Sequence, residues 1–134
     1  MPLPTADYVR LASFRSAMRR FLHFSEEEAA RCGLSSQQYQ ALLSVRATPE
    51  GARVTINDLA RQLVIKHNSA VGLVDRLAEQ GLLRRRAIPE DRRKVELCLT
   101  TKGRRVLARL ASVHRAELRR LAPIMGRVLD ELGR

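Results

Sequence analysis

The sequence predicts a mainly α-helical fold with one small β-hairpin. Apolar residues recur at helical spacing over most of the 134 residues, while the stretch from 82 to 99 alternates with a period of two. Glycine or proline punctuates these segments. The length suits one compact domain, or one domain with a helical extension. Hydrophobic residues at 45% and charged residues at 29% indicate a folded chain rather than a disordered one.

The N-terminal third predicts two helices. Residues 6–31 place apolar side chains at helical spacing, and Gly33 is positioned to end this helix. A second helix is expected from residue 36 to about residue 47, capped by Ser35. A turn is expected over residues 48–51, where proline is followed by glutamate and glycine.

The middle of the chain predicts two further helices joined by a short break. Thr55 and Asp58 have the spacing of a capping box, which opens a short helix through residue 63. After a break at 64–66, a helix is expected over 67–80, with a glycine directly behind it.

The C-terminal half predicts a hairpin and then two helices. Residues 82–88 and 95–99 form the two sides of the hairpin, with a charged tip over 89–93. A long helix is expected over 101–121. Proline cannot continue the helical hydrogen-bond ladder, so a separate helix is expected over 123–132.

This order describes a helix-turn-helix with a β-hairpin behind it, a winged helix-turn-helix. Residues 35–105 are the expected nucleic-acid-binding domain. Residues 1–34 and 106–134 carry apolar stripes larger than such a small core can cover, so both termini together are expected to form a helical dimerisation region. The candidate dimerisation residues are Phe14, Phe21, Leu118, Ile124 and Leu129.

The charge distribution indicates a nucleic-acid partner. The formal net charge is +11, and 22 of the 25 basic residues are arginine. Residues 53–105 hold 13 basic and 6 acidic residues, a net +7, whereas residues 1–34 hold 5 and 4, a net +1. An arginine bias of the genome would spread the charge evenly, so the concentration favours a surface for nucleic acid.

The helix expected over 67–80 has one outer face whose N-terminal half is free of negative charge, so this end should enter a major groove. Asn68 can hydrogen-bond adenine, and Val71 can contact a thymine methyl. Gly72 is unfavourable inside a helix, which suggests close approach of backbone and DNA. The candidate residues of this helix and its entry are Lys66, His67, Asn68, Ser69, Val71, Gly72 and Arg76.

Three stretches carry a family resemblance when taken in order: T-I-N-D-L-A-R-Q-L, then S-A-V-G-L-V-D-R-L-A-E-Q-G-L-L-R-R, then P-E-D-R-R-K-V-E-L-C-L-T-T-K-G. The chain resembles the multiple antibiotic resistance regulator (MarR) family of winged-helix repressors. The resemblance implies a homodimer joined through both termini, two winged helices straddling pseudo-palindromic DNA, and a small effector or a reactive thiol that releases the DNA. Two departures are a missing serine cap near Lys66 and a glycine at position 72.

The resemblance also assigns roles in the hairpin. Arg93 is implied as the wing arginine that enters the minor groove, and Asp91 as its brace. Asp75 is expected to hold an arginine, either Arg76 or Arg93. The candidate wing residues are Arg84, Arg86, Asp91, Arg92, Arg93 and Lys94.

The expected function is therefore a sequence-specific, double-stranded DNA-binding transcriptional regulator of the cytoplasm, responsive to a small aromatic or anionic effector. No cofactor, metal site, catalytic group, signal peptide or membrane span is expected. Two alternatives stay open. One is a non-specific architectural nucleic-acid-binding protein, which the charge alone would allow. The other is a thiol-based redox-sensing repressor using Cys32 or Cys98.

Overall fold

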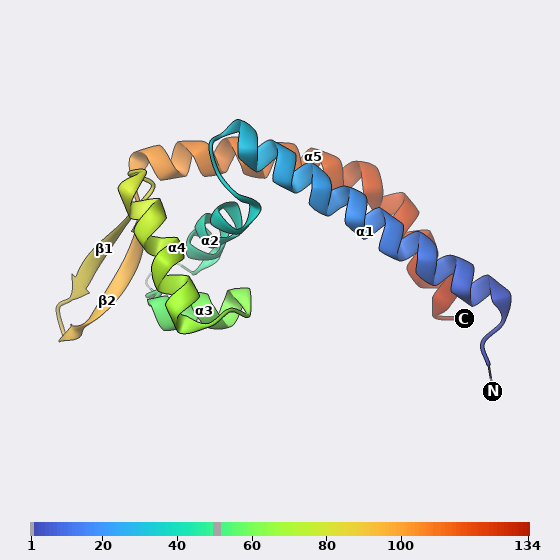
Figure 1. Ribbon diagram of the computed structural model, residues 1–134, viewed down its shortest axis with the longest axis horizontal. Coiled ribbons are helices and arrows are strands. Elements are labelled where there is room, and N and C mark those ends of the chain that lie inside the picture. The colour runs from blue at the N-terminus through green and yellow to red at the C-terminus, as the bar shows by residue number, and fades with distance from the viewer. Residues whose placement is uncertain (1, 50–51) are drawn as a thin grey trace.

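Five helices and one two-stranded antiparallel sheet make up residues 2–49 and 52–134, the part of the chain described by this computed structural model (Figure 1). The mainly helical fold with one hairpin is thereby confirmed. The elements are α1 (Thr5–Arg31), α2 (Ser36–Ala47), α3 (Ile56–Leu63), α4 (His67–Glu79), β1 (Leu83–Ile88), β2 (Asp91–Leu99) and α5 (Thr101–Leu132).

The helix boundaries follow local capping chemistry. Ser35 Oγ accepts from the backbone N–H of Gln38 at 3.1 Å, and the Gln38 side chain accepts from Ser35 N–H at 2.8 Å. The same reciprocal pair joins Thr55 and Asp58 at the start of α3. Because the Thr55 N–H donates to this carboxylate, the pKa of Asp58 lies below its usual range. Gly33, with φ of 76°, follows the end of α1 as expected.

The prediction of two C-terminal helices is wrong, because α5 runs without interruption through Pro123. Proline removes one backbone hydrogen bond, which tertiary contacts can offset. Leu121 and Met125, on either side of the proline, line the same apolar cavity as Ala17 and Phe21 of α1. Packing against α1 therefore supports the helix on both sides of Pro123. The turn expected over 48–51 includes residues 50 and 51, which lie outside the described residues.

A hydrophobic core joins α2, α3, α4, the hairpin and the first half of α5. Its largest fully buried side chains are Leu42, Leu59, Leu73, Leu77, Leu83, Leu110 and Val74. This core fixes the orientation of α4 relative to the hairpin, since both elements contribute leucines to it.

A buried polar contact lies where this body meets the arm formed by α1 and α5. His114 Nε2 lies 2.8 Å from Ser25 Oγ, and the His114 ring stacks on Tyr39 with a centroid distance of 4.3 Å. The three residues come from α5, α1 and α2. The hydrogen bond therefore joins the two helices of the arm, and the aromatic stack on Tyr39 connects the arm to α2 of the body.

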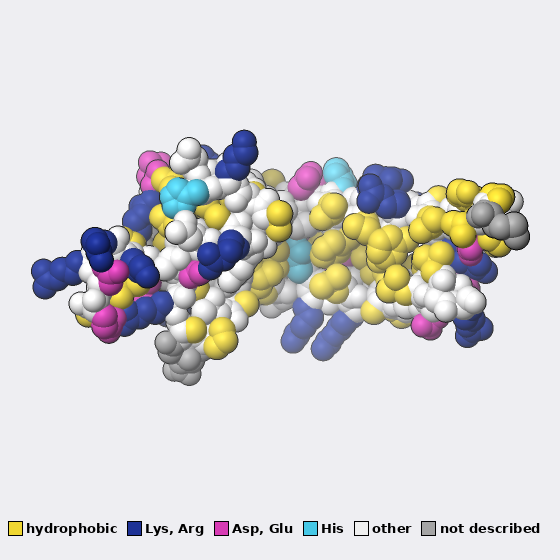
Figure 2. Space-filling view, turned by 90° about the horizontal axis from the view of Figure 1, so that it is seen from below, with side chains coloured by type: hydrophobic (Ala, Val, Ile, Leu, Met, Phe, Trp, Pro, Cys, Tyr) yellow, Lys and Arg dark blue, Asp and Glu magenta, His cyan; other side chains and the backbone are white. Residues whose placement is uncertain are grey.

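The arm presents many apolar side chains to solvent, visible as the yellow area on the right of Figure 2. Leu118, Ile124 and Leu129 are 51%, 44% and 54% exposed. Phe14 and Phe21 are half-buried along α1. A single chain thus leaves the predicted dimerisation residues largely uncovered.

Candidate nucleic-acid interface

Helix α4 buries one face and leaves its N-terminal half open. Asn68 and Ser69 are exposed, while Val71 and Gly72 are half-buried. Lys66 stands at the N-cap without a side-chain hydrogen bond, in line with the missing serine cap. A Cβ atom on Gly72 would meet only Arg76 Nη1, at an ordinary 3.5 Å. Packing within the chain therefore does not require glycine at this position.

His67, the first residue of α4, is held by α3. Its Nδ1 lies 2.6 Å from Asn57 Oδ1, and because an amide oxygen only accepts, the imidazole Nδ1–H donates. The ring is thereby oriented with Nε2 free of this contact. Sequence reasoning missed Asn57, and only its position one residue before the capping Asp58 could have signalled it.

The hairpin register isolates three basic residues at the wing. Ala87 pairs with Val95, but the next β1 residue, Ile88, pairs with Asp91. The strand β2 thus advances by four positions while β1 advances by one, so residues 92–94 have no counterpart on β1. An irregularity of this kind redirects side chains out of the sheet. It frees Arg92, Arg93 and Lys94, all exposed, from cross-strand pairing.

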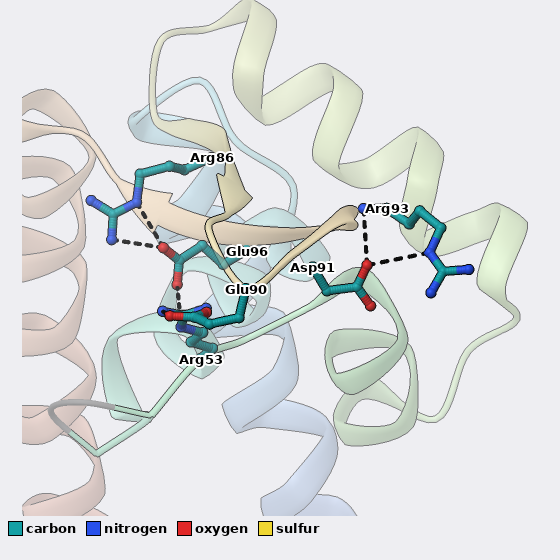
Figure 3. Close-up of polar contacts among 6 residues, drawn as sticks. All are labelled: Arg53, Arg86, Glu90, Asp91, Arg93 and Glu96. Carbon is teal, nitrogen blue, oxygen red and sulfur yellow. Dashed lines mark hydrogen bonds and ion pairs between the residues drawn. The ribbon is translucent and has the colours of Figure 1, made fainter.

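Asp91 braces Arg93, as the resemblance implied (Figure 3). Its Oδ1 accepts from the backbone N–H of Arg93 at 3.2 Å and from Nε at 3.3 Å. The Arg93 side chain is nevertheless 93% exposed. Asp91 orients the guanidinium through Nε, and the two terminal nitrogens make no contact with Asp91. This arrangement suits insertion into a narrow groove.

A second ion-pair network holds the other side of the hairpin. Glu96 is buried and accepts from Arg86 Nε at 2.7 Å, and its other oxygen lies 3.7 Å from Arg53 Nε (Figure 3). Arg53 also donates to Glu90, which holds the pKa of Glu90 below its usual range. Arg86 is thus engaged within the protein. Sequence reasoning missed Glu96, because its carboxylate lies where alternation with Leu97 predicts an outer position.

Asp75 does hold an arginine, but the prediction that this arginine is Arg76 or Arg93 is wrong. Its carboxylate accepts from Arg85, and neither Arg76 nor Arg93 bonds to it. Arg85 lies opposite Leu97, so it projects from the face of the hairpin that packs on α4. This pair connects the middle of α4 to the hairpin.

The start of α4 and the wing meet in one open cleft of about 510 Å³. His67, Arg93 and Lys94 line it together with α3 residues, including Asn57 and Arg61. Arg84 and Arg86 are not part of it. Basic groups from three elements therefore converge on a surface that carries the open end of a helix.

Within the described residues, Cys32 and Cys98 are free and half-buried thiols. No group of three or more His, Cys, Asp or Glu side chains in residues 2–49 and 52–134 could hold a metal ion. In the described part of the chain, none of the helices contains an apolar stretch that is long enough to cross a bilayer.

Comparison with known proteins agrees with this geometry. Residues 33–94 match the sequence model of the MarR family. The HTH-type transcriptional repressor YetL of Bacillus subtilis (strain 168) is 28% identical over 113 residues, which are 84% of this chain and 65% of YetL. This chain thus spans less than two thirds of that relative.

Solved structures share the fold. A probable transcriptional regulator from Pseudomonas aeruginosa is 29% identical, with a TM-score of 0.64 over 81% of this chain and 80% of that one. A complex of S. aureus MepR with DNA has a TM-score of 0.72 at 20% identity, over 82% and 80% of the two chains. The helix-turn-helix and the hairpin behind it form a winged-helix fold, and over residues 33–94 this chain is similar to the MarR family.

Proposed function

We propose that this chain is a sequence-specific, double-stranded DNA-binding transcriptional regulator that acts as a homodimer on a pseudo-palindromic operator in the cytoplasm. Residues 35–105 would bind the DNA, and residues 1–34 and 106–134 would form the dimer. The single observation that carries the proposal is the cleft in which the open start of α4 meets the braced, exposed Arg93.

Each part of this surface has a role in the proposal. Asn68, Ser69 and Val71 would face base edges in the major groove. Arg93 would enter the adjacent minor groove, which attracts arginine through its negative potential. Lys66, His67, Arg92 and Lys94 would contact phosphates, which fix register but carry no sequence information.

The output is proposed to be repression, relieved by a small aromatic effector. YetL is named a repressor, which supports the first part. The second is supported by a cavity of about 390 Å³ between α1 and α5, lined only by apolar side chains such as Met18, Phe21 and Leu118. An aromatic ring would pack against these apolar side chains, whereas an anion would meet no cation among the lining residues.

Arg93→Ala tests the DNA-binding surface. We expect operator affinity to fall at least about tenfold, because the variant loses a charged contact in the minor groove. A gel-shift titration on a duplex selected from genomic DNA by the wild-type protein measures this. Arg127→Ala, which removes an exposed arginine from the arm, is the matched control and should bind as the wild type does.

Two results would count against the proposal. Unchanged affinity of Arg93→Ala would remove the assigned role of the wing. A wild-type protein that binds unrelated competitor duplexes as tightly as the selected one, at the same salt concentration, would favour the non-specific architectural alternative.

A further inference from the structure

The outer face of α5 carries a row of arginines that the DNA-reading surface does not use. We call this row the α5 arginine stripe. Its five members are Arg104, Arg105, Arg109, Arg115 and Arg119. All five are exposed, and none of them takes part in an ion pair among the described residues.

The stripe is continuous and nothing bulky interrupts it. At about 100° per residue, the five arginines fall within an arc of roughly 140° along about 22 Å of helix. The only other residues of this arc between 104 and 119 are small: Ala108, Ser112 and Ala116. The polar hydrogen of Ser112 is already donated to the Ala108 carbonyl at 2.9 Å. The guanidinium groups of the stripe are therefore separated only by small side chains.

The stripe points away from the proposed operator surface. The opposite side of α5 is buried against α1, α2 and β2 through residues such as Leu107, Leu110 and His114. In Figure 1, the first half of α5 runs along the upper side of the molecule, and α3, α4 and the hairpin lie below it. The same DNA site that contacts His67 and Arg93 would thus leave the stripe free.

The predicted dimer contacts leave the stripe open as well. At the same rotation per residue, Leu118, Ile124 and Leu129 fall outside its arc. Each protomer of a dimer would therefore present one stripe.

The charge density on this helix favours a polyanionic partner. Residues 101–120 contain seven basic residues and one acidic residue, Glu117, which is paired with Arg120. Arg105 and Arg109, like Arg115 and Arg119, are like charges four residues apart, an arrangement that destabilises a helix. A string of phosphates would relieve this repulsion along the whole stripe.

The chemistry of the stripe selects nucleic acid over other polyanions. A membrane-binding helix needs large apolar side chains beside its basic ones, and the stripe has only alanines and a serine. It also lacks asparagine, glutamine and other groups that read base edges, so contacts would go to the backbone alone. Arginine forks match phosphate oxygens in pairs.

We propose that the α5 arginine stripe is a second, sequence-independent DNA-binding surface, through which an operator-bound protein holds another DNA segment. This inference rests on the proposed function, which assigns the surface around His67 and Arg93 to the operator. The protein would then bridge two duplexes.

A two-duplex capture experiment tests the proposal. A duplex selected from genomic DNA by the wild-type protein is fixed to beads and loaded with full-length protein, and a labelled duplex of unrelated sequence is added. The wild type should retain the labelled duplex, and retention should fall steeply with salt. The triple variant Arg104→Gln, Arg109→Gln and Arg115→Gln should load normally but lose at least about tenfold in retention, because three phosphate contacts are removed.

A matched variant controls for net charge. Arg15→Gln, Arg19→Gln and Arg20→Gln remove three exposed arginines from α1 and should retain the labelled duplex as the wild type does. Loss of retention in both triple variants, or in neither, would overturn the proposal. So would a wild-type protein that loads on the beads yet captures no labelled duplex, or a stripe that binds vesicles of anionic phospholipid instead of DNA.

The Arg93→Ala variant separates this inference from the proposed function. It should load poorly on the selected duplex, yet bind the unrelated duplex in solution with unchanged affinity. Adding the three stripe substitutions should weaken that binding at least about tenfold and leave only the phosphate contacts of Lys66, His67, Arg92 and Lys94. If Arg93→Ala loads normally while the stripe variant still loses capture, the assignment of the operator to the surface around His67 and Arg93 is wrong. The second DNA-binding surface on α5 is then still supported. If the stripe substitutions leave solution binding intact, the stripe fails.

Discussion

Val64 occupies the turn between α3 and α4 in a left-handed conformation, with φ of 55° and ψ of 50°. A β-branched residue is disfavoured there, because its Cβ crowds the neighbouring carbonyl. The side chain is 89% exposed and so gains almost nothing from packing. Valine at this turn is therefore in an unfavourable backbone conformation that its side-chain contacts do not offset.

Replacing Val64 with glycine should therefore stabilise the protein. We expect Val64→Gly to raise the free energy of unfolding by about 1 kcal/mol, as relief of the left-handed conformation exceeds the entropy that glycine adds to the unfolded chain. Urea denaturation followed by circular dichroism measures the change. Gln62→Gly, two residues earlier and inside α3, should instead lower the free energy of unfolding by about 1 kcal/mol. A loss of stability in Val64→Gly would contradict this account of the turn.

Single residues of the site were predicted where local rules apply and missed where distant segments meet. The brace between Asp91 and Arg93 spans two positions, and the resemblance placed it correctly. The partner of Asp75 is ten residues away on a different element, so pattern alone could not choose Arg85. His67 and Asn57 are joined by the turn at Val64, whose geometry the sequence does not display.

At the scale of elements, Gly103 explains how the hairpin, α4 and α5 meet. It lies in the first turn of α5, where a Cβ atom would stand 2.1 Å from the Leu82 carbonyl oxygen. The helix can approach the backbone after α4 this closely only because residue 103 has no side chain. The Leu82 carbonyl also accepts the N–H of Thr100 at 3.1 Å, so it is not free to move away.

Gly103→Ala should consequently be severely destabilising. Moving either backbone would break the contact between α5 and the base of the wing, so we expect a loss of about 3 kcal/mol or more. Thermal unfolding measures it. Gly126→Ala in the same helix meets nothing within 4 Å and should gain up to about 1 kcal/mol from helix propensity. Equal effects of the two substitutions would show that the close approach is unimportant.

Element order and most boundaries could be predicted because caps and glycines lie within four residues of what they control. The capping boxes at Ser35 and Thr55 and the glycine after α1 are examples. Pro123 shows the limit, since its local rule favours a break and only contact with α1 explains the continuous helix. The three-residue irregularity in β2 was likewise hidden, because alternation reports pairing only in regular strands.

At the scale of the whole molecule, the apolar side chains that the arm exposes support the proposed dimer. Helices α1 and α5 have 27 and 32 residues, about 40 and 48 Å at 1.5 Å per residue, and their outer halves pack on each other alone. They expose several large apolar side chains, among them Leu118 and Leu129, and an apolar surface of this kind is typical of an interaction site. Sequence periodicity predicted these exposed apolar side chains, but it could not show that His114 would stack on Tyr39 and so connect the arm to α2 of the body.

The dimer is tested by placing charge on this apolar surface. Leu118→Glu together with Leu129→Glu should raise the dimer dissociation constant by roughly a hundredfold or more, because two carboxylates per chain would be buried without partners. Both residues are exposed in the single chain, so its fold should survive. Sedimentation velocity would then report a monomer, and operator binding should weaken because one winged helix reads only one half-site. Leu43→Glu on α2, with a similarly exposed leucine, should leave the dimer intact. A double variant that still sediments as a dimer would refute the assignment of the arm, and with it the pairing of two Arg93 side chains on one operator.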